Sequence, residues 1–173
     1  NAAARHPAVV AYYLADEPSM ARAEGCPDAP EDIRRRSELV NGLDPDTPTF
    51  VTLTTWDGVE EYPFGYWAGT ADVFGLVVYP CFQGRCDLSM IDTAVAAADA
   101  AGLGDYWAIV QDFSPSWYAP PDPASVDAQM AAWAGSRMTG YAVYAAGGFS
   151  CCRGSDFETN DAKRAVLERW NRS

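Results

Sequence analysis

The sequence predicts an α/β protein built on a parallel sheet. Runs rich in Val, Tyr, Phe and Thr alternate with segments of helical period, an order typical of parallel strands joined by right-handed crossovers. The runs are mostly apolar on both faces, as in buried parallel sheets. An open doubly wound sheet and part of a (β/α)8 barrel both fit this order. The predicted strands are Val9–Ala15, Thr49–Thr55, Asp72–Tyr79, Tyr106–Asp112 and Gly140–Tyr144.

Four segments carry helix signals. Pro30–Leu43 has Pro in its first turn and offers Ile33, Val40 and Leu43 for a core face. By contrast, Trp56–Thr70 has no helical period and is predicted to be a loop. The other three helices are predicted from a cap residue followed by spaced apolar residues. They are the helix after Asp87 with Leu88, Ile91 and Val95, the helix at Asp122-Pro123 with Val126, Met130 and Trp133, and Asn160–Trp170 with Ala162, Val166 and Trp170.

Polar and aromatic residues gather after the carboxyl ends of the predicted strands, the edge where barrel enzymes concentrate their sites. No GxGxxG or GxxxxGK[ST] motif supports nucleotide binding. Because a complete barrel takes about 250 residues, the predicted strands are expected to be its latter part, in a single domain. The residues after the strands are Asp16-Glu17, Thr54-Thr55-Trp56, Tyr79-Pro80, Gln111-Asp112 and Tyr144.

Composition limits the partners. The chain has 173 residues, with 24 acidic against 12 basic ones and a net charge of -12. An acidic surface argues against nucleic acid and anionic membrane as partners, and no apolar run approaches the ~20 residues of a membrane helix. Nothing in the sequence predicts an oligomeric state. The chain begins Asn1-Ala2-Ala3-Ala4-Arg5, without an initiator Met or a signal peptide's apolar core, and is expected to be a fragment.

The cysteines indicate disulfides and an oxidising compartment. A disulfide between Cys81 and Cys86 would close the short loop CFQGRC, and Cys26 could pair with Cys151 or Cys152. With one histidine, His6, and no CxxC motif, no metal site and no cofactor are predicted. Disulfides are rare in the cytosol, so a secreted or extracytoplasmic protein is expected.

Residues 11–18, AYYLADEP, carry the strongest chemical signal: a strand that ends in adjacent Asp16 and Glu17, before Pro18. Like charges side by side raise one pKa, which can make a carboxyl group a general acid near neutral pH. The alternative is that Asp16 caps a following helix and that Glu17 is solvated. Both interpretations remain open from the residues alone.

Three motifs resemble barrel glycoside hydrolases and their glycosidase-like relatives. HPAVVAYYLADEP, DVFGLVVYP and DYWAIVQDF are similar to the fourth, sixth and seventh strands of that superfamily, and Asp44-Pro45 matches a turn before its fifth strand. The resemblance runs from His6 to Ala145. It implies a partial TIM (β/α)8 barrel, approximately strands four to eight with their helices.

The resemblance gives Glu17 the position of the catalytic acid/base. A glycosidase needs one protonated carboxyl group to protonate the leaving oxygen. Asp16, together with burial against Tyr12 or Tyr13, is expected to raise the pKa of Glu17 for that role.

The chain departs from the pattern on the seventh strand. Retaining enzymes of this superfamily have a nucleophilic Glu there, whereas this chain has Gln111-Asp112. Gln can only hydrogen-bond, and adjacent side chains of a strand point in opposite directions. Three options follow: Asp112 is the second carboxylate after a local bend, the base is elsewhere, for example Asp57 or Asp16, or catalysis has been lost.

Several side chains are candidates for contacts with sugar rings, whose CH faces are apolar. Each aromatic one has ordinary core packing as its alternative, although Trp117 lies in a predicted loop, where aromatic residues more often bind ligands. The candidates are Tyr79, Gln111, Trp56, Trp117 and Tyr144.

The sequence therefore predicts a secreted glycoside hydrolase-like barrel acting on an oligo- or polysaccharide. The first alternative is a non-catalytic carbohydrate-binding relative that has lost one carboxylate. The second is a different barrel enzyme in which the acid pair binds a divalent cation.

Overall fold

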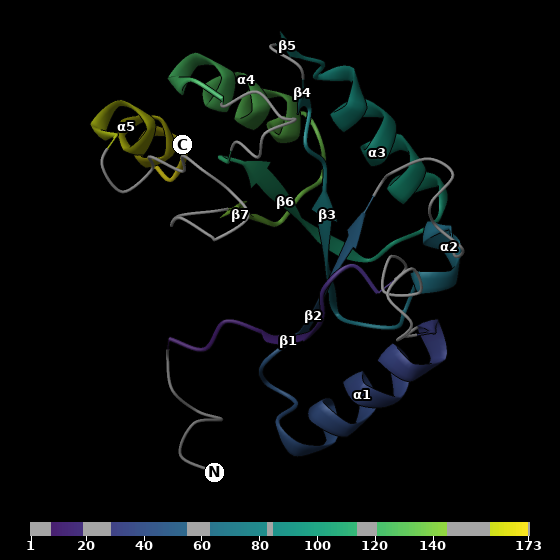
Figure 1. Cartoon of the computed structure of the whole chain (residues 1–173). Coiled ribbons are helices and arrows are strands. Elements are labelled where there is room, and N and C mark those ends of the chain that lie inside the picture. The colour runs from purple at the N-terminus through teal and green to yellow at the C-terminus, as the bar shows by residue number, and fades with distance from the viewer. Residues whose placement is uncertain are drawn as a thin grey trace. The chain divides into compact units, whose positions relative to one another are not determined.

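The computed structural model describes residues 8–18, 29–54, 63–82, 85–113, 121–144 and 160–172. It is an α/β structure with a five-stranded parallel sheet in the order β1-β2-β3-β6-β7, and a separate two-stranded sheet, β4-β5 (Figure 1). The elements are β1 (Tyr12–Ala15), α1 (Pro30–Leu43), β2 (Thr49–Thr54), α2 (Phe64–Trp67), β3 (Val73–Val77), β4 (Cys81–Phe82), β5 (Arg85–Cys86), α3 (Ser89–Ala100), β6 (Asp105–Gln111), α4 (Pro123–Ala134), β7 (Gly140–Tyr144) and α5 (Asp161–Trp170).

The chain divides into two compact units, and the boundary passes through α3 and β6. The first unit comprises Asn1–Val77 and Ala96–Trp107, and the second comprises Val78–Val95 and Ala108–Ser173. The acid pair belongs to the first unit, whereas the end of β6 and all of β7 belong to the second.

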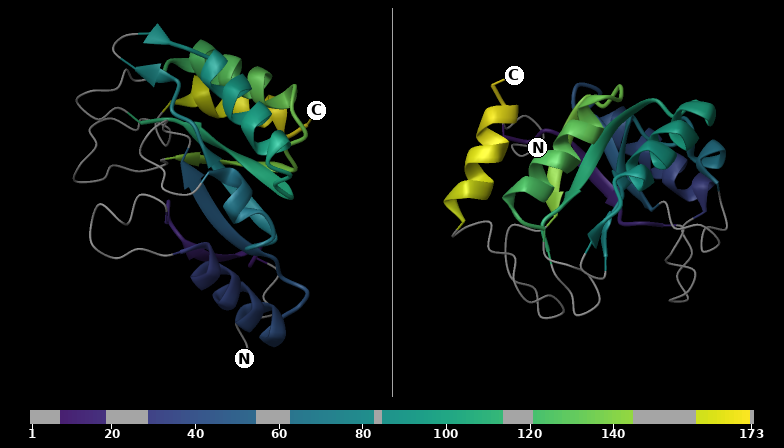
Figure 2. Two further views of the ribbon diagram at one scale, coloured as in Figure 1. Left: turned by 90° about the vertical axis from the view of Figure 1, so that its right-hand side faces the viewer. Right: turned by 90° about the horizontal axis from the view of Figure 1, so that it is seen from above.

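In the first unit, β2 pairs in parallel with both β1 and β3. Alternation along β2 sends Val51 and Leu53 to one face, where they are fully buried, and sends Thr52 to the other. Helix α1 packs beside β1 and β2 (Figure 2). Its Ser37 hydroxyl meets the Thr49 hydroxyl at 2.7 Å inside this contact. The core of this unit therefore lies between the sheet and its helix.

Helix α1 has the predicted bounds but not the predicted face. Pro30 occupies its first turn, and the Ala29 N–H donates to the Asp32 carboxylate at 3.2 Å, which satisfies one free donor of the helix start. Ile33 is buried as expected, but Leu43 is 79% exposed. Ten residues after Ile33, Leu43 is rotated by roughly 80° from its direction at 3.6 residues per turn. The buried row continues through Ser37 to Asp44 instead.

In the second unit, α4 has the predicted apolar face, with Val126, Met130 and Trp133 buried. Helix α5 differs from its prediction, because Lys163 and Leu167 are buried with Val166 while Ala162 is exposed. The two helices pack against each other, and the Trp170 indole N–H donates to Asp127 at 2.8 Å.

The loop CFQGRC contains the predicted disulfide, Cys81–Cys86, and its ends form the short antiparallel pair β4-β5. The predicted partners Cys26, Cys151 and Cys152 lie outside the described residues. The predicted loop Trp56–Thr70 was wrong in one respect, since its later part contains α2, a single turn that buries Trp67. In the described part of the chain, no helix is long and apolar enough to cross a membrane.

Candidate functional site

A β-bulge in β1 sets the direction of the acid pair. Tyr13 is paired with Phe50, but Ala15 is paired with Val51, so Leu14 is an extra residue in this register. After the bulge, Asp16 follows in the position next to Thr52. Without it, alternation would turn Tyr13 and Asp16, three residues apart, to opposite faces. The bulge therefore brings Tyr13, Asp16 and Thr52 to the same face of the sheet.

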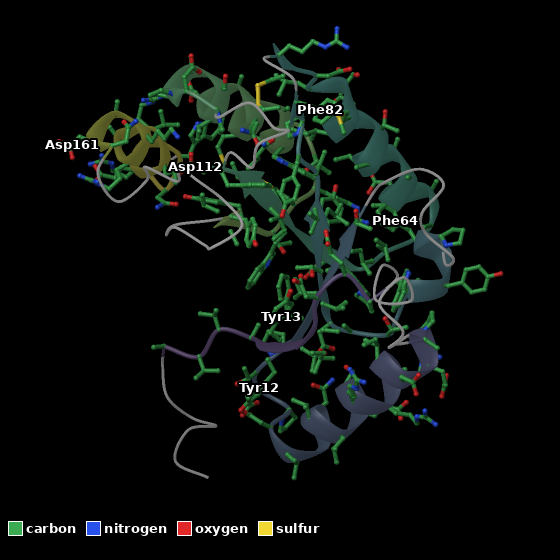
Figure 3. All side chains as sticks on the ribbon, in the orientation of Figure 1. Tyr12, Tyr13, Phe64, Phe82, Asp112 and Asp161 are labelled. Atoms are coloured by element: carbon green, nitrogen blue, oxygen red, sulfur yellow. A yellow bond between two sulfur atoms is a disulfide. The ribbon has the colours of Figure 1, made fainter. Side chains whose placement is uncertain are left out.

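These three side chains form one hydrogen-bonded cluster. The Tyr13 hydroxyl donates to Asp16 Oδ1 at 2.5 Å, and the Thr52 hydroxyl donates to the same oxygen at 2.8 Å. The two hydroxyl oxygens are 2.9 Å apart. Tyr12 has no part in this cluster, because its hydroxyl donates to Asp44 Oδ2 at 2.9 Å, and Figure 3 shows the two tyrosines on opposite sides of β1.

Glu17 is held by its backbone. Its N–H donates to the Thr52 hydroxyl at 3.0 Å, and its φ is +41°, a left-handed conformation in which no other non-glycine residue of the described chain is found. Such conformations cost free energy and cluster at functional sites. Here the strained residue is the predicted acid, and it directly precedes Pro18, which restricts it further.

Burial and, to a smaller extent, the neighbouring charge of Asp16 together raise the pKa of Glu17 to about 7. The shift has the direction and the two causes that the sequence predicted. The pKa of the Tyr13 phenol is also raised, first by burial and then by its bond to Asp16. Near neutral pH, Glu17 is therefore a carboxyl group that can carry a proton and release it.

The second unit brings Tyr79 and Tyr144 together, both predicted as sugar contacts. Their rings are stacked, with centroids 6.1 Å apart and an interplanar angle of 22°. Phe113 packs edge-on against both, at 4.7 Å from Tyr79 and 5.4 Å from Tyr144. The Asp112 N–H donates to the Tyr144 carbonyl at 2.7 Å, which ties the end of β6 to β7 beneath these rings. We call Tyr79, Phe113 and Tyr144 the aromatic cluster; Tyr144 is 39% exposed.

Gln111 is fully buried and both ends of its amide are engaged. Its Oε1 accepts from the Cys81 N–H at 2.9 Å, and its Nε2 donates to the Cys81 carbonyl at 3.1 Å. Gln129 of α4 binds the Gln111 backbone in the same two-bond manner, at 3.0 and 3.2 Å. The Gln111 amide thus anchors the disulfide-closed loop to β6, and the contact of Gln111 with substrate stays a prediction.

Asp112, the predicted second carboxylate, forms an ion pair with Lys163 of α5. The Lys163 Nζ lies 2.5 Å from Asp112 Oδ1, and their side chains are 4% and 0% exposed. The Asp112 carboxylate is thus bound by a buried ammonium group, and its role as the second carboxylate stays a prediction.

The remaining predicted residues are not placed. Trp56 and Trp117, like Asp57, lie outside the described residues. Within the described ranges, no group of three or more His, Cys, Asp or Glu side chains is arranged to hold a metal ion.

Sequence reasoning missed Thr52, Lys163 and Phe113. Thr52 lies in the run TFVTLT, where alternating polar residues on an otherwise apolar strand were the available signal. Lys163 had a weaker signal, a lysine among the apolar positions of the last helix. Neither signal identifies the partner, which only the fold supplies.

The sequence matches no protein-family description and no curated protein. The structure is similar to that of a candidate alpha-L-fucosidase from Bacteroides thetaiotaomicron, with a TM-score of 0.59 and 11% identity, over 97% of this chain and 57% of that one. It is also similar to a beta-glucuronidase from Parabacteroides merdae, with a TM-score of 0.48 and 12% identity, over 80% of this chain and 19% of that one.

The first of these similarities establishes the fold. Almost the whole chain is matched, while the chain spans only 57% of the fucosidase's length. The predicted parallel α/β architecture is confirmed and is consistent with part of a TIM-like barrel. The assignment of these strands as the fourth to the eighth stays a prediction.

Proposed function

We propose that this chain belongs to a secreted glycoside hydrolase-like protein that hydrolyses O-glycosidic bonds of an oligo- or polysaccharide, with Glu17 as the general acid/base. The observation that carries the proposal is a partly buried carboxyl group with a pKa of about 7 at the carboxyl end of β1. The similarity to the fold of a candidate fucosidase supports the class of reaction but not the sugar.

In this mechanism, Glu17 protonates the glycosidic oxygen as the bond to the leaving sugar breaks. The oxygen of a water molecule finally bonds to the anomeric carbon in its place, and a carboxylate accepts the proton of that water. The group must be protonated at the start and must ionise readily, and a pKa near the working pH meets both requirements. Asp16 stays beside it as a charge that raises the pKa of Glu17. Considered by itself, the aromatic cluster of the second unit offers ring edges and faces that could bind the apolar CH faces of a sugar.

The second carboxylate decides between hydrolysis and simple binding. Asp112 is engaged by Lys163, and Gln111 is engaged by Cys81. These contacts favour Asp16, or a residue outside the described part of the chain, over Asp112 as the partner of Glu17. They also favour the second candidate function, a carbohydrate-binding relative that retains the acid but does not cleave.

The test is hydrolysis of a glycan panel by the full-length protein and by Glu17→Gln. We expect the variant to lose about 10²- to 10⁴-fold in kcat, the usual contribution of general acid catalysis. Aryl glycosides with a dinitrophenol leaving group need no protonation of that group, so on these the variant should retain most of its kcat/KM, which reports the cleavage of the glycosidic bond. Glu38→Gln, an exposed glutamate of α1, is the matched control.

Equal cleavage of a natural glycan by the wild type and Glu17→Gln would exclude Glu17 as the acid. Saturable binding of a glycan without any cleavage by the wild type would support the carbohydrate-binding relative instead.

A further inference from the structure

Asp16 and Glu17 are adjacent acids in different surroundings. Asp16 is exposed and its Oδ1 accepts two hydroxyl donors, at 2.5 Å from Tyr13 and 2.8 Å from Thr52. Glu17 is half-buried, and its backbone N–H donates to the Thr52 hydroxyl. The same network therefore supplies donors to one acid and a backbone anchor to the other.

Two hydroxyl donors to one oxygen fix the position of the Asp16 side chain. Burial favours the neutral form of the Glu17 carboxyl group, and a negative charge held beside it favours that form further. Asp16 is the titratable group whose charge acts on Glu17 in the described chain, and the charge of Glu17 acts in turn on Tyr13.

We propose that the hydroxyl groups of Tyr13 and Thr52 hold the Asp16 carboxylate beside Glu17 and thereby help to keep the proton on Glu17. Both are positioning residues, since they act through Asp16. The inference rests on the proposed function in one respect, namely that the proton so placed is the one given to the glycosidic oxygen. The placement itself is a property of the free protein.

The β-bulge at Leu14 is what makes this arrangement possible. It shifts the alternation of side chains along β1 by one residue, so that Tyr13 and Asp16 lie on the same face. The Glu17 backbone nitrogen then lies 3.0 Å from the Thr52 hydroxyl oxygen. Thr52 has a double role: it donates to Asp16 and accepts from Glu17. The Tyr13 hydroxyl donates to Asp16 and lies 2.9 Å from the Thr52 hydroxyl, so its removal leaves the bond between Thr52 and the Glu17 N–H in place.

The experiment follows the Glu17 carboxyl carbon by ¹³C NMR during a pH titration of the full chain, with the signal assigned by its absence in Glu17→Gln. Tyr13→Phe removes one donor, and Tyr13 is 55% exposed, so the fold should tolerate the change. We expect the midpoint of Glu17 to fall by about one unit, because the Asp16 carboxylate is no longer held beside Glu17. Tyr12→Phe, the same change on the opposite side of β1, is the control and should leave the midpoint unchanged.

Thr52→Ser retains the hydroxyl and should behave as the wild type, whereas Thr52→Val should lower the midpoint as Tyr13→Phe does. A Glu17 midpoint that is the same in wild type, Tyr13→Phe and Thr52→Val overturns the proposal. Backbone amide spectra show whether each variant keeps the fold. The titration needs no substrate, so absence of glycan cleavage would contradict the proposed function and leave this result standing.

Discussion

The ammonium group of Lys163 lies 2.5 Å from the carboxylate of Asp112, and both side chains are buried. This pair joins the end of β6 to α5 in the second unit. It also explains one difference between the predicted and the observed face of α5, namely that Lys163 is among the buried residues of this helix. Breaking it should therefore affect stability.

Asp112→Asn and Lys163→Met should each lower the free energy of unfolding by about 3–5 kcal/mol, because each leaves one buried charge without its partner. Urea denaturation measures the loss. The double variant Asp112→Leu/Lys163→Met should recover much of it, since it leaves no uncompensated charge. Arg172→Met breaks an exposed ion pair with Glu168 and is the control. Equal losses in this control and in Lys163→Met would contradict the prediction.

Glu17 should make stability fall with rising pH. Its pKa is about 7 in the folded protein and near 4.5 as a free group, so between these values the folded state holds the proton that the unfolded state has released. The contribution of Glu17 to the free energy of unfolding is therefore complete below about pH 4.5 and is lost as the pH rises through about 7. The loss is about 3 kcal/mol, because each unit of pKa difference corresponds to about 1.36 kcal/mol.

Glu17→Gln should accordingly be more stable than the wild type at about pH 8, with the advantage disappearing at about pH 4. Thermal or urea unfolding at the two pH values measures the difference, with Glu38→Gln as the control. A stability gain for Glu17→Gln that is the same at both pH values would show that removal of the charge is not its cause.

Gln111→Leu should destabilise the protein by about 1–3 kcal/mol for each backbone group of Cys81 left unsatisfied, because the leucine fills the space but cannot hydrogen-bond. Gln111→Glu keeps an acceptor for the Cys81 N–H but loses the donor to the Cys81 carbonyl, so it separates the contributions of these two hydrogen bonds. Amide hydrogen exchange gives a local measurement: the Cys81 N–H should exchange faster in Gln111→Leu. Unchanged protection there would mean that the amide does not anchor the loop.

Tyr144→Ala should weaken the binding of a glycan ligand about fivefold, equivalent to about 1 kcal/mol, while Tyr144→Phe should retain the affinity because the ring remains. Isothermal titration calorimetry measures both. Tyr66→Ala removes an exposed tyrosine of α2, outside the aromatic cluster, and is the control. If Tyr144→Ala and Tyr66→Ala bind the glycan equally well, the aromatic cluster is not a binding surface.

Regular elements were predictable where local signals were strong. Pro30–Leu43 and Gly140–Tyr144 have their predicted bounds, since Pro in the first turn and β-branched or aromatic runs act within a few residues. The Cys81–Cys86 disulfide was predictable for the same reason. The short pair β4-β5 and the single turn α2 were not, because such small elements have almost no periodic signal.

The acid pair shows where prediction from sequence ends. AYYLADEP determined that two adjacent carboxyl groups would follow a strand, and like charge alone predicted the direction of the Glu17 pKa shift. The extra residue at Leu14 could not be predicted, because a bulge is defined by the partner strand.

Thus the sequence by itself determined the alternation of strands and helices and the place of the acids at a strand end, since these depend on neighbours along the chain. Tertiary structure alone decided the contacts of the site residues. Thr52 and Tyr13 donate hydrogen bonds to Asp16, Lys163 forms an ion pair with Asp112, and the Gln111 amide binds the Cys81 backbone. Each of these contacts except that of Tyr13 joins residues at least 30 positions apart. Their geometry depends on strand register and burial, which no local pattern encodes.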